Sequence, residues 1–332
     1  MSDARVRMTI DLRSPGKATG VILVPVSTNE SAYGVIPIPI VAINGGVGPC
    51  LLLVAAIHGD EFEGPLALRR LTRELAPSEI AGRIILLPYA NLPALRAGAR
   101  VSPLDGKNLN RIFPGDAQGG PSDMLAHFMA QVLLPEADVV IDLHSGGRSL
   151  LYTPLAATHL RGDPAIDRQA LDALKAFGAP IGLIARDIDS HGLFDYTAES
   201  LGKLVISTEL GGGAIYDPEA GRLGYEGVRR LLHHFGVLRN APRITTPSRI
   251  METPSLECFS MSKAAGLYEP HIRLGCEVHI GDVLGEVHSL DDHDAASTVT
   301  HAKTSGILIC RRGQGLVASG DCTAIVARDF AE

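Results

Sequence analysis

Short apolar runs separated by polar or glycine-rich turns dominate the first two thirds of the chain. Five of these runs predict strands, over residues 51–57, 83–89, 139–143, 181–185 and 204–208. Runs with so few polar positions are typical of strands that are covered on both faces. Apolar residues recur at helical spacing over residues 65–75, 122–134, 166–177 and 224–235. Strands alternating with helices predict an α/β domain with a mainly parallel, mixed sheet and helices on both faces.

The pattern differs at both ends of the chain. Residues 20–27 and 34–43 read as two additional β segments around the polar turn TNESAYG. After Arg239, prolines mark a linker-like stretch, and from Gly266 onward short β segments alternate with glycine turns. We therefore predict an α/β domain over residues 1–240 and a small all-β domain, similar to a barrel or sandwich, over residues 241–332.

Composition and charge narrow the classes of function. Apolar residues make up 45% and charged residues 20% of the 332 positions, as in ordinary globular proteins. The net charge of -7 argues against nucleic acid as the main partner, since binding phosphates requires clustered Lys and Arg. No run approaches the roughly 18 apolar residues of a membrane span, and residues 1–17 contain no apolar core of a signal peptide. The five cysteines form no CxxC pair, so we expect a cytoplasmic protein without disulfides.

Three predicted strands end in residues suited to catalysis. The strand at 51–57 leads into His58 and Glu61, the strand at 139–143 into His144, and the strand at 204–208 into Glu209. In open α/β sheets, ligands bind outside the carboxyl ends of the strands. We therefore expect these four side chains to meet in one crevice, although they lie far apart in the sequence.

Two histidines and a carboxylate are a common ligand set for catalytic zinc, which keeps a fourth position for water. We predict one Zn²⁺ per chain on His58, Glu61 and His144. Zinc lowers the pKa of its bound water to about 7, and a carboxylate must then move the proton to the leaving amine. Glu209 is the candidate base, because its flanking glycines leave room for substrate, and Asp142 is placed to orient His144. A single HxxE is more often a surface turn, but three strand ends of this kind rarely coincide by chance.

The polar segment RVSPLDGKNLNRIFPG offers candidate substrate ligands. A guanidinium group grips a carboxylate at two points, so Arg111 beside Asn110 is suited to a substrate α-carboxylate. Arg100 is placed to stabilise the developing oxyanion. Taken alone, the segment reads equally well as a surface loop with solvated arginines. The predicted zinc ligands favour the functional interpretation.

Together, HGDE, NLNR, DLHSGG and the glutamate of TELGGG resemble the succinylglutamate desuccinylase/aspartoacylase family, relatives of the zinc carboxypeptidases. The resemblance covers roughly residues 20–330. It implies zinc on His58, Glu61 and His144, Glu209 as general base, and Asn110 with Arg111 on the substrate carboxylate. The form RVSPLDGKNLNRIFPG and the N-terminal β segments are most similar to members acting on N-α-acetyl-L-2,4-diaminobutyrate in ectoine degradation.

The expected activity is hydrolysis of a small N-α-acyl amino acid, in a chain that is either a monomer or a homo-oligomer. An amino side chain would suit the acidic residues that crowd the loop after the strand at 181–185, which are Asp187, Asp189, Asp195 and Glu199. A dicarboxylic substrate would need another cation, such as Arg148 or Arg186. An N-acyl-aspartate or N-succinylglutamate deacylase, a metallocarboxypeptidase and an inactive metal-binding or assembly protein remain the alternatives.

Overall fold

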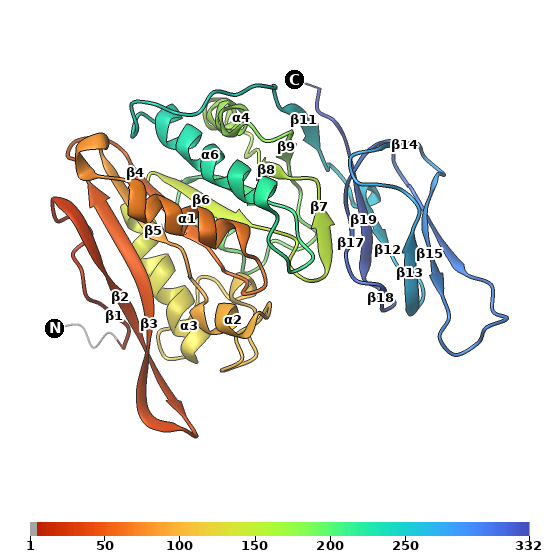
Figure 1. The fold of residues 1–332 in the computed structure, drawn as a ribbon, viewed down its shortest axis with the longest axis horizontal. Helices are drawn as coiled ribbons and strands as arrows, with labels where there is room; N and C mark the ends of the chain where they lie inside the picture. Colours follow the sequence, from red (N-terminus) through yellow and green to blue (C-terminus); the bar gives the residue numbers. More distant parts are fainter. Residues whose placement is uncertain (1–4, 332) are drawn as a thin grey trace.

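One long sheet runs across the molecule, with helices packed against its middle and more β structure at its C-terminal end (Figure 1). The computed structural model describes residues 5–331. Along the sheet, neighbouring strands are β1 (Arg7–Met8), β2 (Gly16–Thr28), β3 (Ser31–Asn44), β5 (Arg83–Leu87), β4 (Cys50–Ala55), β6 (Val139–His144), β10 (Leu204–Glu209), β8 (Leu155–Thr158), β9 (Ile181–Ile184), β11 (Arg249–Glu252), β19 (Cys322–Asp329), β17 (Gly306–Arg312) and β14 (Glu277–Val278). Two short strands lie beside this path, β7 (Leu150–Tyr152) next to β17 and β12 (Phe259–Met261) next to β19.

The middle of the sheet is largely parallel. β5, β4, β6 and β10 pair in parallel, as do β8 with β9 and β9 with β11. Both ends are antiparallel, and β8 also runs against β10. The predicted mixed sheet is therefore confirmed, with its parallel pairs in the middle and antiparallel pairs at both ends, while helices on both of its faces remain a prediction. The two predicted N-terminal segments are confirmed as the hairpin β2–β3.

The α-helices among residues 5–331 are α1 (Glu63–Glu74), α2 (Leu92–Ala97), α3 (Pro121–Phe128), α4 (Pro164–Phe177), α5 (Phe194–Ser200) and α6 (Pro218–His234). All four predicted helices are present, although α3 passes into a wider π-type turn over Met129–Leu133. α4 and α6 begin earlier than the apolar spacing indicated. Each starts with a proline after an aspartate, Asp163 or Asp217, whose carboxylate accepts backbone N–H groups of the first turn.

Alternate residues of the central strands belong to different core clusters. On β4, Leu51 and Leu53 pack with residues of α1, α4 and α6. Leu52 and Val54 belong instead to the cluster that contains residues of α3 and α5. This alternation follows from the period of two along a strand. It holds the C-terminal ends of β4, β6 and β10 rigidly at one edge of the core.

The segment after α6 continues the long sheet instead of standing apart from it. β11 pairs with β9, β19 pairs with β11 and β17, and β17 pairs with β7, where Cys310 faces Tyr152. A separate antiparallel sheet completes this segment, with neighbouring strands β16 (Thr298–His301), β15 (Val283–His288), β13 (Gly266–Pro270) and β18 (Leu316–Val317). A domain boundary near residue 240 remains a prediction, but the segment after it shares backbone hydrogen bonds with the α/β part.

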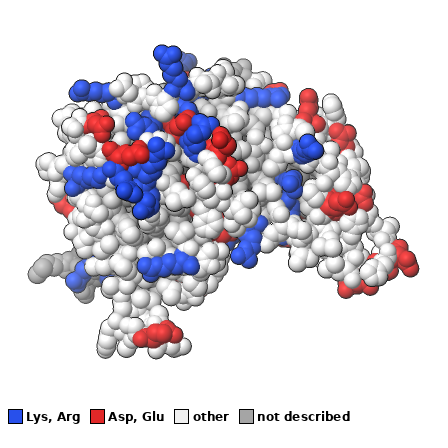
Figure 2. Space-filling model, viewed as in Figure 1, with Lys and Arg blue, Asp and Glu red and all other residues white. Residues whose placement is uncertain are grey.

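The surface carries both charge signs. Figure 2 shows basic and acidic side chains intermingled over α1 and α6, where Arg70 pairs with Glu74 and Arg222 with Glu226. Within residues 5–331, no helix is long and apolar enough to cross a membrane.

Candidate metal centre and active site

The three predicted zinc ligands lie together at the C-terminal ends of β4 and β6. His144 is the last residue of β6, while His58 and Glu61 lie in the turn between β4 and α1. Glu61 bridges the histidines, with 2.7 Å from Oε1 to His58 Nδ1 and 2.9 Å from Oε2 to His144 Nδ1. One ligand atom from each residue lies within 4.8 Å of the others, and all three residues are buried or nearly so. The spacing suits three ligands of one ion.

The backbone of the turn explains why the sequence HGDE is needed here. Ala56, just before the turn, has φ of +56°, a left-handed conformation that costs a non-glycine residue on the order of 1 kcal/mol. A Cβ on Gly59 would lie 1.9 Å from the backbone of Ala94, so only glycine fits at position 59. The turn is therefore held tightly, and it aims His58 and Glu61 at the same point.

Hydrogen bonds fix which ring nitrogen of His58 and of His144 faces the proposed metal position. His144 Nε2 lies 2.9 Å from Asp142 Oδ2, as predicted, and His58 Nε2 lies 3.1 Å from Asn108 Oδ1. Because a carboxylate only accepts, and Asn108 Oδ1 already accepts from the backbone N–H of Asn110, both Nε2 atoms donate. The two Nδ1 atoms are then free to bind a metal, so the residues fit zinc. Sequence reasoning missed Asn108, although it stands in the NLNR motif.

The electrostatics differ among the three residues, and burial lowers the pKa of His58. Burial alone would raise the pKa of Glu61, but His58 and His144 outweigh it and hold that pKa below its usual value. Burial acts against protonated His144 as well, yet Asp142 and Glu61 raise its pKa well above the usual value. The centre thus keeps its carboxylate ionised, as a metal ligand must be.

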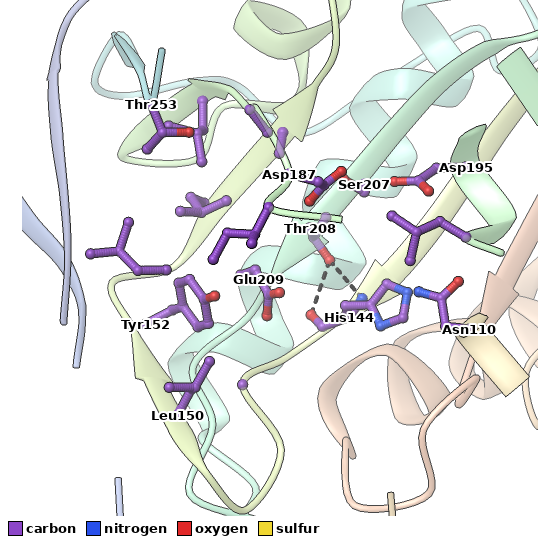
Figure 3. Close-up of a pocket in the computed structure, with 18 of the residues that line it drawn as sticks. Asn110, His144, Leu150, Tyr152, Asp187, Asp195, Ser207, Thr208, Glu209 and Thr253 are labelled. Atoms are coloured by element: carbon purple, nitrogen blue, oxygen red, sulfur yellow. Dashed lines mark hydrogen bonds between the residues drawn. The ribbon is translucent and has the colours of Figure 1, made fainter. Parts of the chain in front are cut away.

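Glu209 ends β10 directly beside the metal ligands. It pairs in register with His144 on one side and Leu155 on the other. Its Oε2 is buried and has no hydrogen-bond partner among residues 5–331, and burial together with Glu61 raises the pKa of Glu209 to about 8. Figure 3 shows its carboxylate between His144 and Tyr152, facing the cavity. An unpaired carboxyl group in this position is available to exchange protons with a ligand.

The glycines after Glu209 have a packing role that the sequence did not indicate. A Cβ on Gly212 would lie 2.1 Å from Leu150 O, and Gly146 donates its N–H to Gly211 O at 3.1 Å. The glycines let the loops after β6 and β10 pack backbone to backbone. That they also leave room for substrate stays a prediction.

Arg100, Asn110 and Arg111 also line the cavity. Asn110 Oδ1 accepts from Phe194 N at 2.8 Å, and in Figure 3 the amide nitrogen of Asn110 points toward His144. Arg111 Nη1 donates to its neighbour's carbonyl oxygen, Asn110 O, at 2.6 Å. Arg100 Nη1 lies 3.7 Å from Glu61 Oε1, so this guanidinium reaches the metal centre. The structure thus brings every predicted site residue to one cavity or its immediate support.

The cavity measures about 550 Å³ and has walls of two kinds. Asp187, Asp189 and Asp195 supply carboxylates, and Figure 3 shows Asp187 and Asp195 near Ser207. The segment after residue 240 supplies mostly apolar side chains to the wall, which are Thr253, Phe259, Ile309, Cys322 and Ile325. The individual residues were not predicted, since no sequence signal relates these strands to β7 and β9.

His159 is another residue that sequence reasoning missed. It follows β8, a strand of only four residues, and its side chain lines the cavity. Recognising that strand would have identified His159, because it too stands at a strand end. Of the predicted alternative cations, Arg148 is not part of the wall, and Arg186 Nη1 donates to Pro254 O at 2.8 Å.

Comparison with known proteins gives consistent matches. The "Succinylglutamate desuccinylase/Aspartoacylase catalytic domain" matches residues 47–235. The chain is 38% identical to N-alpha-acetyl-L-2,4-diaminobutyric acid deacetylase of Halomonas elongata over 323 residues, which cover 97% of this chain and 94% of the relative.

Solved structures agree with the sequence comparison. The product-bound ectoine utilization protein EutE (DoeB) from Ruegeria pomeroyi superposes with a TM-score of 0.95 at 38% identity, covering 99% of this chain and all of the other. A succinylglutamatedesuccinylase/aspartoacylase from Rhodobacter sphaeroides gives 0.94 at 36% identity, covering 98% of this chain and all of the other.

Proposed function

The chain belongs to the succinylglutamate desuccinylase/aspartoacylase family, and from this premise we propose that it is a zinc-dependent deacylase of N-α-acetyl-L-2,4-diaminobutyrate. The products are acetate and L-2,4-diaminobutyrate. One observation carries the proposal: the ends of β4, β6 and β10 bring a His-Glu-His ligand set and an unpaired carboxyl group to one cavity. Metal-dependent hydrolysis of an amide uses both groups.

The proposed ligands of one zinc ion per chain are His58 Nδ1, the carboxylate of Glu61 and His144 Nδ1. When bound, zinc supplies Lewis acidity that polarises a carbonyl group and acidifies water. Glu209 accepts a proton from the attacking water and delivers it to the amide nitrogen as the C–N bond breaks. Its buried carboxyl group, free of protein partners, suits this shuttle.

The remaining side chains hold the substrate. Asn110 and Arg111 bind the α-carboxylate, and Arg100 stabilises negative charge that develops on the carbonyl oxygen. The 3.7 Å separation of Arg100 and Glu61 supports this role, since it places the guanidinium beside the metal centre. Holding the α-carboxylate fixes the α-amide near zinc and leaves an amide on the side chain out of reach.

The cavity wall supports a substrate with an amino side chain. Asp187 and Asp195 would repel the second carboxylate of N-acetylaspartate or N-succinylglutamate, and Arg186 already donates to a backbone carbonyl. The relative from Halomonas elongata is named for the diaminobutyrate reaction. Strands after residue 240 wall off part of the cavity, which favours a small substrate over a peptide. The complete ligand set and Glu209 argue against an inactive protein.

Rates on four substrates test the assignment: N-α-acetyl-L-2,4-diaminobutyrate, its γ-acetyl isomer, N-acetylaspartate and N-succinylglutamate. With the zinc-loaded protein, we expect kcat/KM to be highest for the α-acetyl isomer. Faster cleavage of a dicarboxylic substrate would contradict the proposed substrate, while the proposal of amide hydrolysis would still hold. If the protein cleaves none of the four, the deacylase proposal itself is wrong.

A further inference from the structure

A second cluster of titratable side chains forms the cavity wall away from the metal centre. Its members come from three elements: His159 follows β8, Asp187 follows β9, and Asp195 and Glu199 lie on α5. His159 Nε2 lies 3.1 Å from Asp187 Oδ2, and its Nδ1 lies 2.9 Å from Glu199 Oε1. The ring also stacks on Tyr196, with 4.5 Å between ring centroids. His159 therefore ties together three separate parts of the wall.

These contacts fix the charge of His159. Carboxylates only accept hydrogen bonds, so both ring nitrogens must carry protons, and His159 is an imidazolium. Although burial lowers the pKa of His159, its bonds to Asp187 and Glu199 raise that pKa to about 10. His159, Asp187 and Asp195 also lie close enough to hold a metal ion, so the number of zinc ions bound per chain is part of the test.

Asp195 is the carboxylate that this cluster leaves open to the cavity. Its Oδ1 accepts the backbone N–H of Tyr196 at 2.9 Å, and no side chain among residues 5–331 is hydrogen-bonded to it. Burial, with Asp142 and Asp187, raises the pKa of Asp195 to about 6, although His159 opposes the shift. Three carboxylates share one imidazolium, so the wall has an excess of negative charge. A cation from the cavity would balance it.

We propose that Asp195 and Asp187 bind the ammonium group at the end of the substrate's side chain, with His159 as the residue that positions them. This inference rests on the proposed function, because it places the side chain of the same substrate. A primary ammonium has three N–H donors, enough to bridge two carboxylates, and a charge-assisted bond of this kind is stronger than a neutral one. The positive charge of His159 offsets the repulsion between Asp187 and Glu199. Its hydrogen bonds to both carboxylates also hold them in place when the amine enters.

The test compares two substrates that differ only in that ammonium group. N-α-acetyl-L-2,4-diaminobutyrate and N-acetyl-L-norvaline have side chains of the same length, ending in NH₃⁺ or CH₃. The zinc-loaded wild type should prefer the charged substrate by about ten- to a hundredfold in kcat/KM, the range expected for a hydrogen bond between charged groups. Asp195→Asn should abolish most of this preference, by lowering kcat/KM far more for the charged substrate than for the norvaline substrate.

Asp189→Asn is the matched control, since Asp189 lines the same cavity but is exposed and makes no contact with His159. It should keep the preference. His159→Gln should raise KM for the charged substrate with little change in kcat on the neutral one. His159→Gln should also raise the pH below which that KM increases, because His159 lowers the pKa of Asp195 while Asp142 and Asp187 raise it. A merely structural role of His159 would affect both substrates alike.

Calorimetric titration with L-2,4-diaminobutyrate and L-norvaline separates this inference from the proposed function, since binding requires no turnover. If Asp195→Asn keeps the wild-type preference in both assays, the ammonium subsite is wrong even when the deacylase is active. If the wild type cleaves neither substrate but binds diaminobutyrate through Asp195, the subsite stands and the proposed function falls. Two zinc ions per chain, with one lost in His159→Gln, would also overturn the subsite.

Discussion

Removing the acceptor behind His144 is the most direct test of how the metal centre is built. Asp142 is 1% exposed, its Oδ2 lies 2.9 Å from His144 Nε2, and its Oδ1 has no partner among residues 5–331. The bond to His144 is therefore the main interaction of this carboxylate. Asp142→Ala would leave a buried N–H unpaired and let the ring take the tautomer in which Nδ1 carries the proton.

Loss of such an acceptor typically weakens metal binding about 10- to 100-fold, or about 1.4 to 2.7 kcal/mol. We expect the upper end of this range for Asp142→Ala. Asp142→Asn should fall near the lower end, because its amide oxygen still accepts. The control is Asp138→Asn at the other end of β6, where Oδ2 accepts only from Cys50 N. It should leave zinc affinity unchanged.

Competition with a chromophoric chelator at neutral pH measures the zinc affinity of each variant. Circular dichroism and thermal unfolding show whether the variant is folded. Wild-type affinity in Asp142→Ala would refute the reasoning, because the hydrogen bond would then not hold His144 in its metal-binding form. Asn108→Ala, which removes the acceptor behind His58, provides a second measurement of the same effect.

Three further results follow from the structure. Removing metal with a chelator should abolish turnover and added zinc should restore it; full activity in metal-free protein would contradict the zinc proposal. Glu209→Gln should reduce kcat by about a hundredfold or more, the range for general acid–base catalysis, while zinc stays bound by metal analysis; Arg111→Ala should mainly raise KM. His159 has a raised folded-state pKa of about 10 against 6.5 for the unfolded chain. The interactions of protonated His159 therefore stabilise the fold fully below pH 6.5, and this stabilisation is lost as the pH rises toward 10. In urea unfolding, the free energy of unfolding of His159→Gln should not show this loss.

The proposed catalytic residues were predictable because their chemistry and their positions in the sheet indicated the same site. His58, His144 and Glu209 each follow a long apolar run, and the ends of adjacent parallel strands must meet. Asp142 was predictable from its place two residues before His144 on the same strand. In these cases a residue's neighbours in space follow from its neighbours in sequence.

Other features depend on contacts that no local pattern encodes. His159 was missed because β8 has four residues and reads as a loop. The start of α6 was placed too late, since glycines interrupt its apolar pattern. Gly221 is one of them. Farther along the helix, a Cβ on Gly227 would lie 2.4 Å from the ring of Phe177 on α4, so helix packing requires glycine there. The cavity wall beyond residue 240 follows only from pairing of β17 with β7 and of β11 with β9.

The position of β19 sets the order in which the site is completed during synthesis. Glu209 leaves the ribosome well before Ile325, yet Ile325 lies on the strand that joins β11 to β17 and forms part of the cavity wall. A nascent chain that ends after α6 has both histidines, both glutamates and their acceptors, but an open cavity and an unpaired edge on β7. Unpaired edges invite aggregation. The chain therefore has to be synthesised through β19 before its cavity wall is complete.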